Sequence, residues 1–523
     1  MKAERSKLIL VITGAVIFNI IFWNEKPGVN IILFDVFICA SAFYLYPYSL
    51  KSSTCRWLLA GHLITAAMVV IQNTMLSEIG FGITMLLFIS FSQYIHRSAW
   101  YAGGSVLLNY VLVIPNFFRE LSNARGKTIS LSGWSRSARI LLIPLFILMV
   151  FFIIYAFANT VFSSIAADVA AAIESWLTHV FDWFSFERFG FFLLGIFVVG
   201  GLVLRSRSTY FSDADMKKQN SLLRKKNSLK IWKESSFSDL LSIITGKAAA
   251  GIMALKNEFI MGMISLVLLN ILLLFINIID LKYVWLGFTF SKDANMAIYV
   301  HEGAWLLILS IILAMLLLLL FFRGNLNFYK KNNRLRYGAY LWIFQNVFLV
   351  CSVIMRDYYY IFHYGLAYRR IGLLFFLAMV LAGLLTVFLK ICYVKTTYYL
   401  LRINAWVGIL LLVLATSVHW DETIARYNLA RKTSIPTDVH FLLSLSDKTL
   451  PLIEKNKDVL QKDVATRERY YYEGSFYNAI TLFEYRKKDF LNRQMNYTWL
   501  SWNVTDAYVK KELSAGVHIS SLK

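Results

Sequence analysis

Long apolar runs, separated by short polar connections, dominate the first 420 residues of the chain. Each run is close to the roughly 17–25 residues that an α-helix needs to cross the hydrocarbon core of a bilayer. The pattern predicts an all-α fold: a polytopic transmembrane helical bundle of about eleven spans with a small helical C-terminal domain. The predicted spans are 8–23, 30–47, 57–75, 80–95, 139–163, 188–204, 258–280, 300–322, 338–356, 371–393 and 401–418.

A further apolar run, 100–114, is shorter and ends at Pro115. The stretch that follows it, 115–139, is basic, and basic stretches beside spans favour the cytoplasm. With the N-terminus inside, an even number of spans must precede 115–139. Four spans satisfy this condition, so we expect 100–114 to lie in the membrane interface or to re-enter rather than cross.

The net charge of +22 comes mainly from the connections between spans. The connection 205–256 holds eleven Lys or Arg and four acidic residues, and 323–336 holds five basic residues and no acid. Cytoplasmic loops of membrane proteins carry such an excess. We therefore expect the N-terminus inside, the C-terminus outside, membrane lipids as partners and no nucleic acid partner.

The chain becomes polar after Trp420. Residues 421–523 carry sixteen Lys or Arg and thirteen Asp or Glu, without a run long enough to span a bilayer. Apolar residues recur at three-and-four spacing through 459–472, 476–494 and 498–513, which predicts helices. The predicted parts are 1–164 (transmembrane helices), 165–204 (an amphipathic external helix and a span), 205–256 (a basic cytoplasmic loop), 257–420 (transmembrane helices) and 421–523 (a soluble helical domain outside the membrane).

Polar and aromatic residues crowd into 355–370, MRDYYYIFHYGLAYRR, between two predicted spans. The predicted topology places this stretch at the outer face, where the span 300–322 begins with His301 and Glu302. The candidate catalytic residues are His301, Glu302, Asp357 and His363. The candidate ligand-binding residues are Arg356, Tyr360, Tyr364, Arg369 and Asp35.

Several interpretations of this outer cluster stay open. The tyrosines suit the headgroup region, where amphipathic rings collect, and Arg356 with Asp357 could form a local ion pair. Arg369 could hold a phosphate. A structural collar, an acid–base site for a lipid-linked substrate, a metal site and a proton relay all fit the residue types. His301 and Glu302 do not begin an HExxH zinc motif, because Trp305 stands in place of the second histidine.

Few polar residues lie inside the predicted spans. Asp35 is a carboxylate inside the predicted span 30–47. Intramembrane carboxylates commonly mark functional sites. The amides Asn270, Asn277 and Gln345 could bridge helices. A transporter would instead need these residues, together with Asp35, to line one polar path.

Motifs of several enzyme classes are missing from the chain. The sequence has no GxxxxGK[ST], GxSxG or GxGxxG pattern, which argues against a P-loop ATPase, an α/β-hydrolase and a Rossmann enzyme. The four cysteines form no CxxC pattern. We therefore expect no cofactor and no metal, and we lean against an enzyme.

Motifs in the second half of the chain resemble a known family. They are YVHEG (299–303), FRGNLNF (322–328), LWIFQN (341–346), RDYYYIFHYGLAYRRIG (356–372), RINAW (402–406), ARYNL (425–429), LSLS (443–446) and SWN (501–503). Their order is similar to that of a bacterial membrane family catalogued as domain of unknown function 4173, related to 4153. The first 250 residues resemble the family only in their pattern of spans. The resemblance implies a multi-pass protein of the bacterial plasma (inner) membrane and supplies no reaction.

Three functional hypotheses follow. The first is a protein that senses or scaffolds envelope events, with the external helical domain as the surface for a protein partner. The second is a transporter or channel-like permease. The third is a membrane enzyme or lipid-handling protein that uses the outer cluster. The missing motifs and the sparse polar residues in the spans favour the first.

Overall fold

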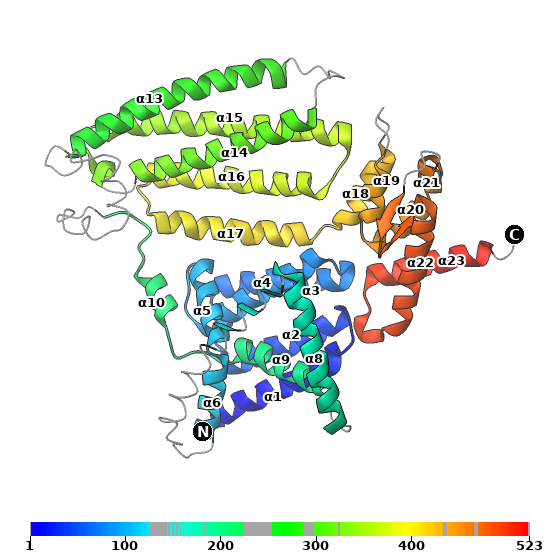
Figure 1. The fold of residues 1–523 in the computed structure, drawn as a ribbon. Helices are drawn as coiled ribbons and strands as arrows, with labels where there is room; N and C mark the ends of the chain where they lie inside the picture. The colour runs from blue at the N-terminus through cyan, green and yellow to red at the C-terminus, as the bar shows by residue number, and fades with distance from the viewer. Residues whose placement is uncertain are drawn as a thin grey trace.

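The computed structural model describes residues 2–124, parts of 144–157, 158–180, 185–223, 254–286, 296–322, 325–431, 437–464 and 469–520. These residues form two helical bundles that share one long direction, and a smaller tail that begins at Trp420 packs at one end of both (Figure 1). We call this end the tail end. The opposite end, where α10 (Tyr210–Lys217) lies, is the α10 end.

The N-terminal bundle is built from the first half of the chain. Its helices are α1 (Lys2–Phe22), α2 (Val29–Leu45), α3 (Ser53–Gln72), α4 (Met75–Gln93), α5 (Ala99–Val111), α6 (Val113–Ala124), α8 (Thr160–Val180) and α9 (Phe186–Val203), with a 3-10 turn η1 (Ser49–Lys51). Helix α8 runs across the other helices in Figure 1 rather than along them, and most of its described side chains are exposed. Its predicted place on the membrane surface stays a prediction.

The C-terminal bundle is a row of long helices. They are α13 (Ala254–Asp280) with a π-helical turn η3 (Leu281–Trp285), α14 (Met296–Phe321), α15 (Asn332–Tyr364), α16 (Tyr368–Cys392) and α17 (Thr397–Thr416), with a 3-10 turn η4 (Asn325–Phe328). Helix α17 packs against α16 on one side and touches α3, α4 and α5 on the other. Trp406 and Ile409 of α17 pack there on the buried Leu58, Leu87 and Phe91.

A second junction joins the two bundles at the α10 end. The Asp215 carboxylate, in α10, accepts hydrogen bonds from the backbone N–H groups of Arg97 (2.7 Å) and Ser98 (3.0 Å) and from the Tyr398 hydroxyl (2.5 Å). Asp215 has no exposed surface. These bonds and a contact to His96 hold the pKa of Asp215 below its ordinary value, although burial alone would raise it. The ionised carboxylate thus ties the α4–α5 connection to α17.

Helices α5 and α6 are bent by 64° at their junction. Three contacts place both at the α10 end: Ser98 N–H bonds to Asp215, Asn109 Oδ1 accepts from Ser206 N–H at 3.0 Å, and Arg119 donates to the Arg205 carbonyl at 3.3 Å. The partners all belong to the segment 205–215. The interface or re-entrant placement of 100–114 stays a prediction, since a bent pair of this kind also fits a broken span.

The tail contains helices and one hairpin. Its elements are α18 (Trp420–Ala430), α19 (Val439–Ser444), η5 (Asp447–Thr449), α20 (Leu450–Glu454), α21 (Lys457–Val464), β1 (Tyr470–Tyr472), β2 (Ser475–Tyr477), α22 (Ala479–Asn496), η6 (Trp499–Ser501) and α23 (Val504–Ser520). The strands are antiparallel, with Tyr470 opposite Tyr477. Glu473 and Gly474 connect them with φ of 45° and 82°, as a two-residue hairpin turn requires. The helix predicted through 459–472 is therefore wrong at its C-terminal end.

Membrane-spanning character is confirmed, while the number of spans is not. Eight described helices are long and apolar enough to cross a membrane, or nine if α5–α6 counts as one span. Helix α2 and the segment Leu306–Phe321 of α14 are apolar but shorter. The predicted span 139–163 falls largely outside the described residues. The chain is thus a multi-pass all-α protein, and eleven spans stay a prediction.

Helix α15 is longer than predicted. The expected connection 357–370 remains helical as far as Tyr364, because Val353, Arg356, Asp357 and Tyr360 continue the buried face at helical spacing. Gly365, with a φ of 89°, ends the helix.

Candidate functional site at the tail end

The turn between α3 and α4 exposes backbone groups at the tail end. Asn73 adopts the left-handed conformation after α3, and Thr74 caps α4 through a reciprocal pair of hydrogen bonds with Ser77. The turn therefore needs only two residues. It leaves the last carbonyl groups of α3 available to a donor from outside the helix.

Lys448 of the tail supplies that donor. Its Nζ contacts the carbonyl oxygens of both Gln72 and Asn73. A cation at a helix C-terminus is favoured by the macrodipole. Burial lowers the pKa of Lys448, against the opposing effect of the Asp506 and Asp421 carboxylates.

A second charged contact joins the tail to the α1–α2 connection. Lys26 Nζ lies 2.5 Å from Asp506 Oδ2, and both side chains are largely buried. Burial raises the pKa of Asp506, but hydrogen bonds from Lys26 and Asn503 and the charges of Lys26 and Lys448 outweigh it and hold the pKa below its ordinary value. Asp506 is therefore an ionised partner for two lysines, one on each side of the junction.

Backbone contacts complete the docking on the N-terminal bundle. Val29 N–H donates to the Trp502 carbonyl at 3.1 Å, and Thr505 Oγ1 donates to the Ile71 carbonyl at 2.6 Å. A Cβ added to Gly28 would lie 2.6 Å from the backbone carbon of Ser501. Only glycine permits so close an approach of these two backbone segments.

The tail meets the C-terminal bundle through Asn428, the Arg431 guanidinium and apolar side chains. Asn428 of α18 accepts from Leu366 N–H at 2.7 Å and donates to the Leu366 carbonyl at 2.9 Å. A Cβ on Gly365 would approach Asn428 Oδ1 to 2.4 Å. The tail core also continues onto α16 through Ile371 and Phe375. The tail thus bridges the ends of both bundles.

The predicted outer cluster is divided among several helix-to-helix contacts. Arg356 pairs with Asp280 of α13, with both side chains buried. The Arg370 guanidinium lies 4.2 Å from the centre of the Tyr360 ring, and Arg370 also interacts electrostatically with the buried Asp357.

The remaining candidates lie around the α15–α16 connection. The Tyr360 and Tyr364 rings pack 4.7 Å apart, the His363 carbonyl accepts from Arg431 of the tail, and Arg369 is exposed. The side chains of His301 and Glu302 lie outside the described residues. The catalytic and ligand-binding roles of the cluster stay predictions.

Asp35 lies in the interior of the N-terminal bundle and has a partner that the sequence analysis missed. Its Oδ1 is 2.6 Å from Nε2 of His62 on α3, and Cys39 Sγ is 3.4 Å from the same oxygen. Asp35 is six residues from the tail end of α2, and His62 is ten residues from the tail end of α3. Their similar distance from the same end of two neighbouring antiparallel helices is the sequence signal that could have predicted the Asp35–His62 pair.

The intramembrane amides do not share a path with Asp35. Gln345 Nε2 donates to Asn270 Oδ1 at 2.8 Å, and Asn277 Nδ2 donates to the Gln345 carbonyl at 3.2 Å. All three amides are buried between α13 and α15, in the other bundle. They join two helices, as interhelical amides commonly do.

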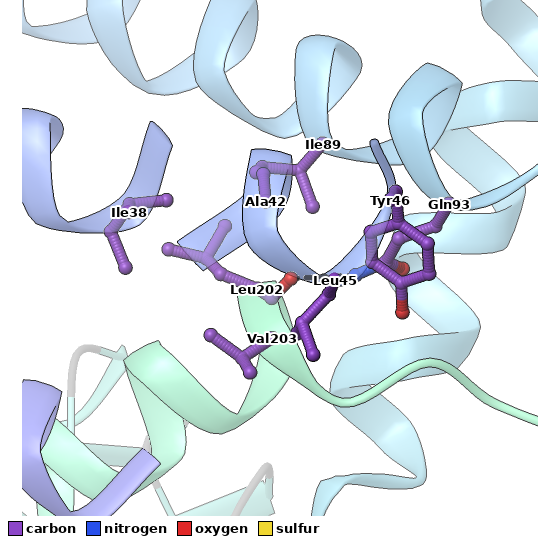
Figure 2. A pocket seen from close by; sticks show the side chains of 8 residues that line it. All are labelled: Ile38, Ala42, Leu45, Tyr46, Ile89, Gln93, Leu202 and Val203. Atoms are coloured by element: carbon purple, nitrogen blue, oxygen red, sulfur yellow. Dashed lines mark hydrogen bonds between the residues drawn. The ribbon is translucent and has the colours of Figure 1, made fainter. Parts of the chain in front are cut away.

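The N-terminal bundle contains a small cavity at its α10 end (Figure 2). Ile38 and Ala42 of α2, Ile89 and Gln93 of α4 and Leu202 of α9 are among its lining residues. Its volume of about 10 Å³ has room for about one water molecule. The cavity is too small for a lipid or a metabolite.

A larger groove lies in the tail. It has a volume of about 630 Å³ and is lined in part by Tyr470–Tyr472, Asp447, Arg486 and Arg493. Arg486 and Arg493 both pair with Asp447, and Arg486 Nη2 donates to the Leu445 carbonyl at 2.8 Å. These bonds fix η5, the turn that presents Lys448 to α3.

Comparison with known proteins assigns the chain to a family. A family model described as a domain of unknown function, DUF4153, matches residues 10–456. The match includes the N-terminal bundle, where the motifs gave only a similar pattern of spans; the relation to the family numbered 4173 stays a prediction. No curated protein and no solved structure matches the chain significantly. The protein is therefore a member of the DUF4153 family of multi-pass membrane proteins, whose domain has no assigned function.

Proposed function

We propose that this protein senses or scaffolds events in the bacterial cell envelope and that its tail is the interaction element. One observation carries the proposal. The tail core, which includes Leu442, Leu450 and Phe483, is continuous with Ile371 of α16. Its contacts with the N-terminal bundle are instead ion pairs and hydrogen bonds, together with the packing of Leu500. Polar contacts can exchange for water at small net cost, so a partner of modest affinity can shift the docking equilibrium.

The proposed topology is eleven spans in the inner membrane, with the N-terminus inside and the tail outside. The α10 end supports this orientation, since Arg205, Arg207, Lys217 and Lys218 gather in the segment around α10. Basic residues favour the cytoplasmic side. The tail then faces the envelope, where a partner could reach it.

The proposed partners are membrane lipids around the bundles and a protein that binds the tail. The tail exposes large side chains, among them Tyr471 (65%), Phe476 (68%) and Met495 (70%). Aromatic residues and methionine are enriched in protein interfaces. No feature of the described surface calls for nucleic acid.

The alternatives receive less support. A transporter needs a polar path, but the amides of α13 and α15 bond to each other, and Asp35 lies in the other bundle. An enzyme at the outer cluster would need Arg356, a candidate ligand-binding residue, to meet a substrate, but Arg356 pairs with the buried Asp280. We therefore place the function in the tail.

Photo-crosslinking in intact cells tests the proposal. A photoreactive amino acid at Tyr471 or Phe476 should give one reproducible protein adduct of defined mass. The matched control is Phe275 of α13, which is similarly exposed (63%) but lies in a predicted span. Phe275 should give lipid adducts alone. The same lipid-only result at all three positions would contradict the proposal.

A further inference from the structure

Five buried polar side chains meet inside the N-terminal bundle. They are Asp35 and Cys39 of α2, His62 and Thr65 of α3, and Thr84 of α4, and each is at most 9% exposed. Asp35 and Cys39 are four residues apart and therefore share one face of α2. Ligand atoms of Asp35, Cys39 and His62 all lie within 4.8 Å of one another.

Thr84 fixes the orientation of the imidazole. Its hydroxyl oxygen lies 3.1 Å from His62 Nδ1 and 2.8 Å from both the Gly80 carbonyl and the Thr65 hydroxyl. When the Thr84 hydroxyl donates to the Gly80 carbonyl, its oxygen accepts from His62 Nδ1–H. Phe81 and Phe88 flank the ring, with centroids 5.1 and 6.1 Å away. With Nδ1 protonated, Nε2 presents a lone pair toward Asp35.

In that tautomer a cation is needed between the two side chains. His62 Nε2 and Asp35 Oδ1 are 2.6 Å apart, a distance that a shared proton satisfies, and a metal ion would bind both atoms after they move slightly apart. A zinc-type ion commonly binds a histidine whose second nitrogen donates to a neighbouring group, the arrangement seen here with Thr84.

A divalent ion suits the charge of the complete cluster. A divalent ion bound by the Asp35 carboxylate, the Cys39 thiolate and the neutral His62 imidazole gives a site with zero net charge. A neutral site is what the interior of a bilayer requires, since an uncompensated charge there is costly. Binding would release the thiol proton of Cys39.

We propose that Asp35, Cys39 and His62 form a binding site for a divalent transition metal of the zinc class, with Thr84 as the residue that positions the imidazole. Nitrogen, sulfur and carboxylate oxygen are the donors that such ions take, and three protein ligands leave one coordination position open. A metal site was not expected from the sequence, because the three ligands lie on two helices and do not form a known metal-binding motif.

Metal analysis of the purified full-length protein tests this proposal. Elemental mass spectrometry should find about one zinc-class ion per chain in the wild type, as a single three-ligand site requires. Cys39→Ser and His62→Gln should lose the ion. Cys55→Ser is the matched control, because Cys55 is buried in the same bundle and lies 3.5 Å from Ser92 Oγ, outside the cluster. The control should retain the ion.

Cobalt substitution gives an independent readout. Co²⁺ added to metal-depleted wild type should produce the absorption of a cobalt–thiolate bond, and Cys39→Ser should lack it while remaining folded by circular dichroism. Equal metal content in wild type and Cys39→Ser, or a cobalt spectrum without thiolate absorption, would overturn the proposal. The cluster would then be a carboxyl–imidazole pair that shares a proton.

Discussion

The two bundles join their helices with different chemistry. In the C-terminal bundle, Asn270, Asn277 and Gln345 link α13 to α15 with neutral amides, and the buried Arg356–Asp280 pair joins the same two helices. In the N-terminal bundle, Asp35 and His62 link α2 to α3. The amides are neutral and the Arg356–Asp280 pair carries its own counter-charge, whereas an acid–imidazole pair depends on a shared proton or a metal. Among these links, the Asp35–His62 pair is therefore the one that leaves a place for an added ion.

The tail repeats this contrast at its two contacts. The Lys26–Asp506 ion pair and Lys448 join it to the N-terminal bundle. Asn428 and the Arg431 guanidinium, which both bond to backbone groups, join it to the α15–α16 connection. Ionised contacts respond to pH, salt and competing charges, and neutral contacts respond much less. The N-terminal contact is therefore the one that an envelope signal can release.

The largest expected effect comes from His62→Leu. The substitution leaves Asp35 buried without its partner, and breaking a buried pair costs about 3–5 kcal/mol. Thermal unfolding of the purified protein should show a large loss of stability. The double variant Asp35→Leu/His62→Leu should recover part of it, because no charge is left behind. A double variant less stable than both single variants would contradict the pairing.

Lys448→Met should loosen the tail. The change removes the donor to the Gln72 and Asn73 carbonyls and should cost about 1–3 kcal/mol of docking free energy. Limited proteolysis should then cut the connection 431–437 faster. Lys455→Met is the control, because Lys455 is exposed and pairs only at the tail surface with Glu512. Equal cleavage of both variants would argue against the contact.

Acid should weaken the tail contact further. The pKa of Asp506 is depressed in the folded protein, so its contribution is present above the unfolded pKa of about 3.9 and is lost as the pH falls through the folded pKa. Burial also lowers the pKa of Lys448 in the folded protein. The unfolded chain therefore binds this proton more tightly, and stability increases as the pH rises from the folded pKa of Lys448 toward its unfolded pKa.

A fluorophore on Met495→Cys, in the exposed part of α22, can follow tail release during acid titration. Asp506→Asn should remove the acid-dependent part of the transition. If Asp506→Asn released the tail at the same pH as the wild type, the acid response would belong to other carboxylates and the role given to Asp506 would be contradicted.

The smallest expected effect is that of Asn270→Leu. Interhelical amide bonds in membranes contribute about 0.6 kcal/mol on average, and both bundles should remain folded. A double-variant cycle with Gln345→Leu should measure a coupling of that size. A coupling as large as that between Asp35 and His62 would remove the contrast between the two bundles.

The apolar runs were sufficient to predict a membrane helical bundle, because run length alone decides whether a helix can span. The end of α15 was not predictable from run length, since Arg356, Asp357 and Tyr360 are polar yet occupy its buried face. The hairpin of the tail was also missed, although three tyrosines before Glu473 and Gly474 are typical of a strand that enters a two-residue turn.

Tertiary partners were beyond the reach of the sequence. Asp35 was identified from its position within an apolar run, but its pairing with His62 depends on how α2 and α3 face each other. Lys448 gave no signal at all, because its partners are backbone carbonyls 375 and 376 residues away.

Hydrogen exchange of the wild-type tail tests the central claim most directly. The account predicts two classes of amide protons. Those at the docking surface, in 446–449 and 498–506, should exchange through an opening of lower free energy than those in the tail core around Phe483 and Phe490 of α22. A single rate class across the tail would contradict it, because docking and folding would then be one event and the tail could not act as a separable interaction element.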